Sequence, residues 1–152
     1  EADDIASVTL TGISATYASY CIAVCDVVPA SDDKRFYMKT GTSGTIDSGT
    51  YDYYLSGSSG TNNISYVYLM AEMGNAAGEG WSGMIWHNRP TTGNGRALFH
   101  FSGGSRNKDN NFTYAWGGGQ KAVVETVDRV KFQTSGGNIT SGRFTLYGIA
   151  HA

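Results

Sequence analysis

Charged residues and prolines are both scarce in this sequence. Only 16% of the 152 residues are charged, against about 25% in an average soluble domain, and there are just two prolines. The eleven lysines and arginines are scattered, and the tightest cluster is the pair Lys34 and Arg35. Nucleic-acid binding needs a basic patch, so nucleic acid is not expected as a partner.

Long hydrophobic runs are missing as well. No segment approaches the roughly 20 apolar residues that cross a bilayer as a helix, so membrane insertion is not expected. A chain of this length buries roughly 70% of the surface that it exposes when unfolded. It therefore needs neither a metal nor a disulfide in order to fold.

Cysteine occurs only at Cys21 and Cys25, within the segment SYCIAVC. In a strand, positions four apart lie on one face and about 13 Å from each other, at roughly 3.3 Å per residue. A disulfide requires Cα atoms within about 7 Å, so these two cysteines are not expected to pair with each other. We interpret them as small buried apolar residues, with an intermolecular bridge or a metal site as the alternative.

Helical periodicity is nearly absent, and short β-rich segments separated by turn residues take its place. A parallel sheet would need helical crossovers, so the pattern predicts one all-β domain over residues 1–152. The expected fold is an antiparallel β-sandwich of the jelly-roll or lectin-like type with about ten strands. The segments expected to form strands are 7–13, 19–28, 34–40, 50–56, 65–73, 80–88, 96–104, 110–119, 127–135 and 142–150.

The last of these segments is among the most strand-like. Phe144 and Leu146 share one face, and Thr145 and Tyr147 share the other. Pairing with 7–13 or 19–28 would prevent the C-terminus from fraying. We expect both termini to emerge at one end of the sandwich, which suits a domain mounted on a larger protein or particle.

Motifs for metal binding and nucleophilic catalysis are missing. His87, His100 and His151 do not have the spacing of zinc ligands, and GxSxG does not occur. The oxygen-rich segments ASDDK and NKDNN do not match a calcium-binding EF-hand loop and are interpreted as polar turns. No metal and no cofactor is expected.

Carboxylates leave one enzymatic alternative open. A glycoside hydrolase needs two carboxyl groups on either side of the scissile bond. Glu72 and Glu79 flank a predicted hairpin and can converge across it, and Glu125 and Asp128 lie later in the chain. Glycan hydrolysis is therefore kept as a less favoured function, and no catalytic residue is assigned.

Aromatic residues are abundant, with ten tyrosines and three tryptophans. Strand alternation directs half of them into the core and half outward. Tyr and Trp join an apolar ring to a polar group, which suits them to stacking on sugars or to subunit contacts. The candidate ligand-binding residues are Tyr53, Tyr54, Trp81, Trp86 and Trp116.

Four segments resemble, in order, a pattern found in virion proteins of tailed bacteriophages, of the tail-fibre or minor structural type. They are TGISATYASYCIAVCDVVPASDD, GTSGTIDSGTYDYYLSG, GNAAGEGWSGMIW and TSGGNITSGRFTLYGIA, and they extend from Thr11 to Ala150. Two departures stand out: Cys21 and Cys25 occupy positions that are usually aliphatic, and DDKRFYMKT lacks a DGG turn.

This resemblance implies a non-enzymatic β-sandwich on the surface of a virus particle, assembled as a homotrimer with other virion proteins as partners. The leading hypothesis is a fibre-tip or receptor-binding domain that contacts carbohydrate of the host surface. The alternative is a capsid decoration, cement or knob protein with a structural role only.

Overall fold

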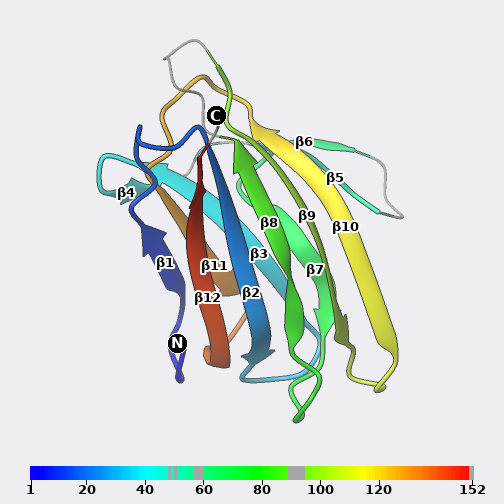
Figure 1. The fold of residues 1–152 in the computed structure, drawn as a ribbon. Coiled ribbons are helices and arrows are strands. Elements are labelled where there is room, and N and C mark those ends of the chain that lie inside the picture. The colour runs from blue at the N-terminus through cyan, green and yellow to red at the C-terminus, as the bar shows by residue number, and fades with distance from the viewer. Residues whose placement is uncertain (48, 50, 57–59, 89–94, 151–152) are drawn as a thin grey trace.

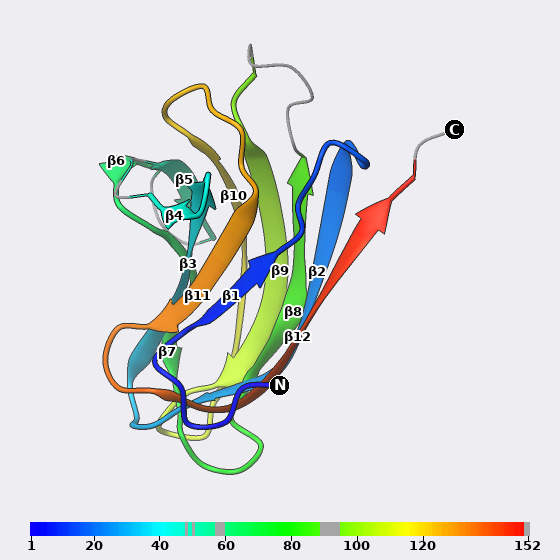
Figure 2. The ribbon, with the colours of Figure 1, turned by 90° about the vertical axis from the view of Figure 1, so that its left-hand side faces the viewer.

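The computed structural model describes residues 1–47, 49, 51–56, 60–88 and 95–150, and these residues form twelve strands and no helix (Figure 1). Every pairing between strands is antiparallel. The strands make two sheets that pack face to face, which Figure 2 shows in a view along their edges. The predicted antiparallel β-sandwich is confirmed. Among the described residues, no helix has the length and apolarity that a membrane span requires.

The larger sheet has seven strands in the order β12-β2-β8-β9-β10-β5-β6. Their bounds are β2 Ser19–Pro29, β5 Tyr51–Leu55, β6 Thr61–Ile64, β8 Trp81–Asn88, β9 Leu98–Arg106, β10 Phe112–Lys121 and β12 Ile139–Ile149.

The smaller sheet has five strands. β1 (Val8–Thr11), β11 (Arg129–Thr134) and β3 (Lys34–Thr42) are neighbours in that order. The free side of β3 pairs with two strands at different points, namely β4 (Thr45–Ile46) and β7 (Val67–Met73).

The core lies between the two sheets and has aromatic rings at its centre. Alternation along β3 directs Phe36 inward, where its ring lies 5.3 Å from that of Trp81 and 5.9 Å from that of Phe132. Phe144 of β12 contacts the same group, with its ring 5.1 Å from Phe132. Rings at these separations and tilts add to the stabilisation that burial alone provides.

Two glycines make room for Trp81. A Cβ atom on Gly83 would lie 2.6 Å from the indole, and one on Gly103 would lie 2.3 Å from it. The two glycines are partners in the pairing of β8 with β9. A fully buried tryptophan is therefore accommodated because its neighbours on the sheet lack side chains.

The closing strand pairs with one of its two predicted partners, whereas the positions of the termini differ from the expectation. β12 pairs with β2, one of the two predicted partners, and Phe144 and Leu146 face the core. However, β12 is at the edge of its sheet, and β1 pairs with β11 instead. The expectation that both termini lie at one end is wrong, because the N-terminus and the end of β12 lie at opposite ends of the sandwich (Figure 1).

Two further differences concern the number of strands and the burial of the cysteines on β2. β4 and β6 were not predicted, since each is short and lies in a polar, glycine-rich stretch. Cys21 is buried as predicted, whereas Cys25 is exposed. Both cysteines are free, as expected, and the prediction of a buried Cys25 is wrong, because it lies on the opposite face of β2 from the core residues Ile22 and Val24 and is exposed there.

Candidate functional site

The outer face of the seven-stranded sheet carries large aromatic and apolar side chains that the core does not use. Along β8, Ile85 and His87 are buried, whereas Met84 and Trp86 point outward and are more than a third exposed. The same alternation continues on β9 and β10. We call this surface the outer face, and its largest exposed members are Tyr54, Met84, Trp86, Leu98, Phe112, Tyr114, Trp116 and Tyr147.

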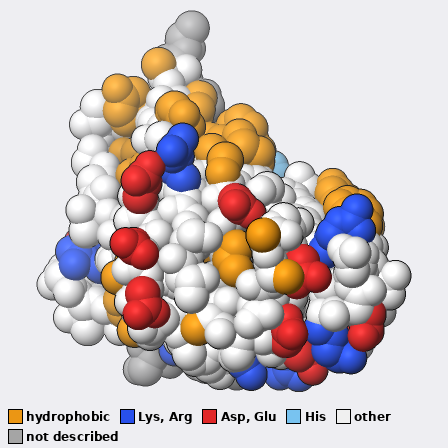
Figure 3. All heavy atoms as spheres, turned by 90° about the horizontal axis from the view of Figure 1, so that it is seen from below, with side chains coloured by type: hydrophobic (Ala, Val, Ile, Leu, Met, Phe, Trp, Pro, Cys, Tyr) orange, Lys and Arg blue, Asp and Glu red, His pale blue; other side chains and the backbone are white. Residues whose placement is uncertain are grey.

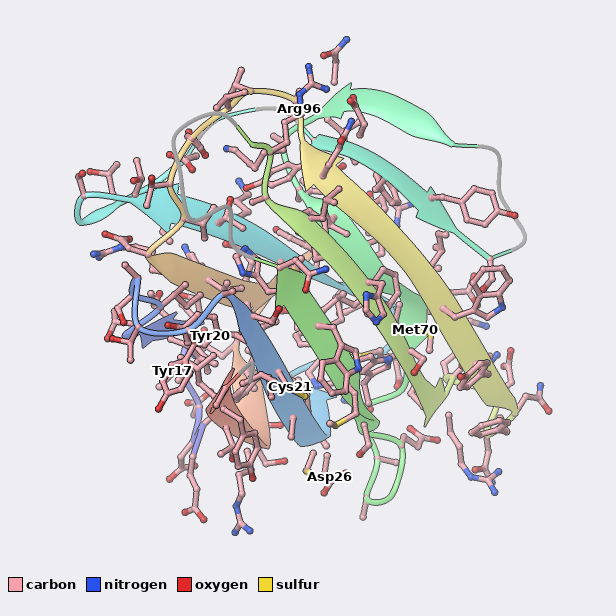
Figure 4. All side chains as sticks on the ribbon, turned by 45° about the horizontal axis from the view of Figure 1, so that its top comes forward. Tyr17, Tyr20, Cys21, Asp26, Met70 and Arg96 are labelled. Atoms are coloured by element: carbon pink, nitrogen blue, oxygen red, sulfur yellow. The ribbon has the colours of Figure 1, made fainter. Side chains whose placement is uncertain are left out.

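Strand register places several of these residues in one line. Trp86 of β8 is paired with His100 of β9, His100 with Gly118 of β10, and Gly118 with Tyr54 of β5. In the other direction Trp86 is paired with Cys21 of β2, which is labelled in Figure 4. Tyr147 of β12 is paired in turn with Cys21. We call this line, which crosses six strands, the aromatic row: Tyr147, Cys21, Trp86, His100, Gly118 and Tyr54.

The rings in and beside this row contact each other in two pairs. Trp86 and His100 are nearly parallel, with centroids 6.2 Å apart and 13° between their planes. Tyr54 and Trp116 are tilted by 45°, with centroids 5.9 Å apart. Gly118 lies between the two pairs and has no side chain, so the face is lowered there.

A shallow trough of about 400 Å³ lies at this lowered part of the face. Its floor is the backbone of Gly118 and Gly119, and its sides are Leu98 of β9 and Tyr54 of β5. Asp52 also lines it, at one end. The trough is therefore apolar along its length and polar at the end where Asp52 lies.

Hydrogen bonds and an ion pair hold the polar end in place. Gln120 donates from Nε2 to Asp52 Oδ2 at 3.3 Å, and Arg96 lies 4.0 Å from the same oxygen. The backbone N–H of Asn63 donates to Asp52 Oδ1 at 3.4 Å. Arg96 lies just before β9, at the end of the sheet where β5 and β6 also lie (Figure 4). Carboxylate, guanidinium and amide groups are thus held side by side at the surface.

The structure brings together three of the five predicted contact residues. Tyr54, Trp86 and Trp116 are 44%, 38% and 52% exposed on the outer face. Trp81 is 0% exposed in the core and cannot reach a ligand as placed, because it is on the opposite face of β8 from Trp86. Tyr53 is half-buried, with its ring 6.0 Å from that of Tyr68, a residue of the other sheet.

Sequence reasoning missed His100, Leu98, Tyr114 and Phe112 as members of the same face. Alternation within the segment RALFHFSGG gives Leu98 and His100 a common face, and that signal was available. Their position beside Trp86 depends on the register between strands, which cannot be read from the sequence pattern of a single strand.

The acidic candidates lie in different surroundings. Glu79 is buried, and its Oε2 accepts the backbone N–H of Ala76 at 2.8 Å, whereas Glu72 is exposed. Asp128 accepts from Arg129 Nε at 2.7 Å, and this guanidinium holds the pKa of the carboxyl below its usual value. Glu125 lies 2.7 Å from Lys121 Nζ in a separate buried cluster.

His87 and His100 lie in different surroundings. His87 is buried between the sheets and His100 is exposed on the outer face. His151 lies outside the described residues. Within the described part of the chain, no group of three His, Cys, Asp or Glu side chains is arranged to hold a metal ion.

Other surfaces of the molecule differ from the outer face. Across the five-stranded sheet, Tyr66 and Tyr68 have rings 4.8 Å apart, and Arg35 donates to the Tyr68 hydroxyl at 2.9 Å. The hydroxyl groups of these tyrosines therefore have hydrogen-bond partners within the protein. Figure 3 shows the lower end of the sandwich, where acidic and basic side chains are intermingled and neither sign covers the surface.

Comparison of the chain with protein-family models, with curated protein sequences and with solved structures finds no match.

Proposed function

We propose that this chain is a surface domain that binds carbohydrate through the outer face of its seven-stranded sheet. The observation that carries the proposal is the aromatic row, in which Trp86, His100 and Tyr54 are brought into line across neighbouring strands and left exposed. A row of this kind costs free energy in water, because large apolar rings remain hydrated. Clusters of such side chains on a soluble protein mark interaction sites.

The chemistry of the face suits a sugar. The faces of Trp86, Trp116 and Tyr54 are apolar plates on which the C–H face of a pyranose can stack. Hydroxyl groups of the same sugar need donors and acceptors, which Asp52 and Gln120 supply at the end of the trough. A binding site of this type combines apolar area with a few fixed polar groups.

The dimensions favour an oligosaccharide. Trp86 on β8 and Tyr54 on β5 are separated by three strand spacings, or about 14 Å. A single sugar ring does not span that distance, so a ligand that contacts both must have several units. The shallowness of the trough also suits a chain that lies across the surface.

Placement on a phage particle, with a host surface glycan as the ligand, is the part of the proposal that rests on sequence resemblance. The four segments that resemble virion proteins include β2, β5, most of β8 and β12. Those strands contribute Trp86, Tyr54 and Tyr147 to the outer face. The resemblance thus involves four of the six strands that the aromatic row crosses, and it leaves out β9 and β10.

A glycan array of bacterial surface oligosaccharides tests the proposal, followed by calorimetry with the best-bound glycan. Trp86→Ala, Trp116→Ala and Tyr54→Ala should each weaken binding by about tenfold or more, equivalent to about 1.4 kcal/mol. The matched control is Tyr66→Ala, which changes a half-buried tyrosine just before β7 of the other sheet. Equal affinity in all four variants would refute the assignment of the outer face.

Assembly through the same face is the second candidate, and it has its own support. Phe112 and Tyr114 are 69% and 57% exposed and extend the apolar surface beyond the trough, and Leu98 at its side is 48% exposed. In a decoration or cement protein, a second copy or another virion protein would cover them. Sedimentation equilibrium would then show an oligomer, and the predicted homotrimer is the specific expectation.

Tryptophan quenching distinguishes the two candidates. The chain has three tryptophans, and Trp86 and Trp116 are exposed whereas Trp81 is buried. If the face is free to bind sugar, iodide quenches emission from the two exposed indoles at every protein concentration. If the face is a subunit contact, quenching falls as the chain associates, and no glycan binds to the associated form.

A further inference from the structure

A lysine is enclosed at the end of β10, away from the outer face. The side chain of Lys121 is 0% exposed, and its ammonium group lies 3.1 Å from Asp47 Oδ2 and 2.7 Å from Glu125 Oε1. Lysine is almost never fully buried unless it is paired. Here one cation is shared between two carboxyl groups.

The surroundings isolate this group from water. The ring of Tyr51 lies 4.8 Å from Lys121 Nζ, and Tyr51 is itself 0% exposed. Gly49 closes another side so tightly that a Cβ atom there would lie 2.7 Å from the same nitrogen. The amine is thus enclosed beside an aromatic ring, and the Asp47 and Glu125 side chains that contact it are 15% and 21% exposed.

Two carboxylates against one ammonium leave an excess negative charge, which is costly to bury. Burial, together with the proximity of Asp47, raises the pKa of Glu125 although the Lys121 ammonium opposes the shift. Burial alone would lower the pKa of Lys121, and the hydrogen bonds from its ammonium to Glu125 and Asp47 outweigh that effect. Glu125 therefore takes up a proton more readily than an ordinary glutamate does.

We propose that Lys121 and Asp47 condense into an intramolecular isopeptide bond, with Glu125 carrying the proton. Glu125 accepts one proton from the Lys121 ammonium and passes it to the Asp47 carboxylate, and the free Nζ lone pair attacks Cγ of the resulting carboxylic acid. The new C–N bond forms, Glu125 carries a second proton from Nζ to the hydroxyl, and the C–OH bond breaks to release water. One ammonium and one carboxylate thus give one amide and one water, and Glu125 ends unchanged.

Formation of a neutral amide removes a buried ion pair, whose desolvation is unfavourable. The bond would also connect the two layers of the fold. Asp47 directly follows β4 of the five-stranded sheet, whereas Lys121 ends β10 of the seven-stranded sheet. The two residues are 74 positions apart, so the bond would close a long loop of the unfolded chain.

The mass of the intact, denatured chain tests the bond. It should be lower than the sequence mass by one water, and the Lys121→Arg variant should have its full mass. Trypsin cannot cleave after an acylated lysine, so digestion should give a branched peptide that joins residues 40–96 to residues 109–129. Full mass in the wild type, together with a free peptide ending at Lys121, would overturn the proposal whether or not any variant folds.

Two further variants test the chemistry, and one control excludes other water losses. Asp47→Asn should lose one ammonia instead of one water, because the leaving group changes. Glu125→Gln should fold and keep its full mass, and a branched peptide in that variant would refute the role of Glu125. Cyclisation of Glu1 or of Asp47 also releases water, so a loss that persists in Lys121→Arg without the branched peptide counts against the bond.

Discussion

The indole of Trp86 stacks on the imidazole of His100, its partner on the neighbouring strand, with ring centroids 6.2 Å apart and planes inclined by 13°. Both side chains are on the outer face, where no core packing restricts their rotamers. Cross-strand pairs of this kind are worth about 0.2–1 kcal/mol. The contact therefore contributes modestly to the free energy of folding. Its larger effect is on the orientation of the Trp86 indole at the surface.

The first prediction follows from this pair. His100→Ala should lower the free energy of unfolding by less than about 1 kcal/mol, because both rings are solvent-exposed. It should also weaken glycan binding, though less than Trp86→Ala does, since it frees the indole to rotate without removing it. Calorimetry and urea denaturation measure the two effects. Binding by His100→Ala that equals wild type would mean that Trp86 needs no support from its neighbour.

The trough between the ring pairs supplies the second prediction. Gly118 forms its floor, and a Cβ atom added there would come no closer than 3.0 Å to another atom, the backbone oxygen of Phe99. Gly118→Val should therefore fold and fill the trough, with a loss of glycan affinity of about tenfold or more.

Gly117 provides the matched control for that variant. A Cβ atom on Gly117 would lie 2.1 Å from the backbone oxygen of Tyr54, so the pairing of β10 with β5 would have to shift. Gly117→Ala should lower the free energy of unfolding by about 1–3 kcal/mol. Urea denaturation of both variants would contradict this account if the alanine at 117 were the better tolerated of the two.

Much of the sandwich was predictable because strand alternation is a local property. The segment KRFYMKT directs Phe36, Met38 and Thr40 to one side, and the structure buries all three. Length and turn residues identified ten of the twelve strands. The two that were missed, β4 and β6, are held by pairing with a neighbour and not by their own composition.

The candidate site was predictable only in part, for a physical reason. Parity within one strand already separates Trp81 from Trp86, since residues an odd number apart face opposite sides. It likewise separates Tyr53 from Tyr54. Grouping all four as ligand contacts conflicts with that rule. The aromatic row itself depends on register between six strands, which is fixed by tertiary packing.

The third prediction compares two residues of the closing strand. Phe144 faces the core with its ring 5.1 Å from that of Phe132, whereas Tyr147 is 51% exposed on the outer face. Phe144→Ala should lower the free energy of unfolding by about 3 kcal/mol, because it leaves a cavity between aromatic rings. Tyr147→Ala should change it by less than about 0.5 kcal/mol. Equal losses in the two variants would be inconsistent with the observed facing of β12.

The last prediction concerns acid stability. Asp128 accepts hydrogen bonds from Arg129 Nε at 2.7 Å and from the backbone N–H of Ser43 at 2.9 Å, so it joins the start of β11 to the turn after β3. The Arg129 guanidinium lowers the pKa of Asp128 from its ordinary value of 3.8. A carboxyl whose pKa is lower in the folded state stabilises the fold above the ordinary value. That stabilisation disappears as the pH falls through the lowered pKa.

Asp128→Asn removes this titration while keeping the shape of the side chain. At neutral pH the variant should be less stable than wild type by about 1 kcal/mol, a modest value because the pair is partly exposed. The gap should narrow as the pH falls below 3.8 and close once the wild-type carboxyl is protonated in the folded state. Urea denaturation across this range measures both chains. A gap that stays constant with pH would show that the stability difference does not come from the charge of Asp128.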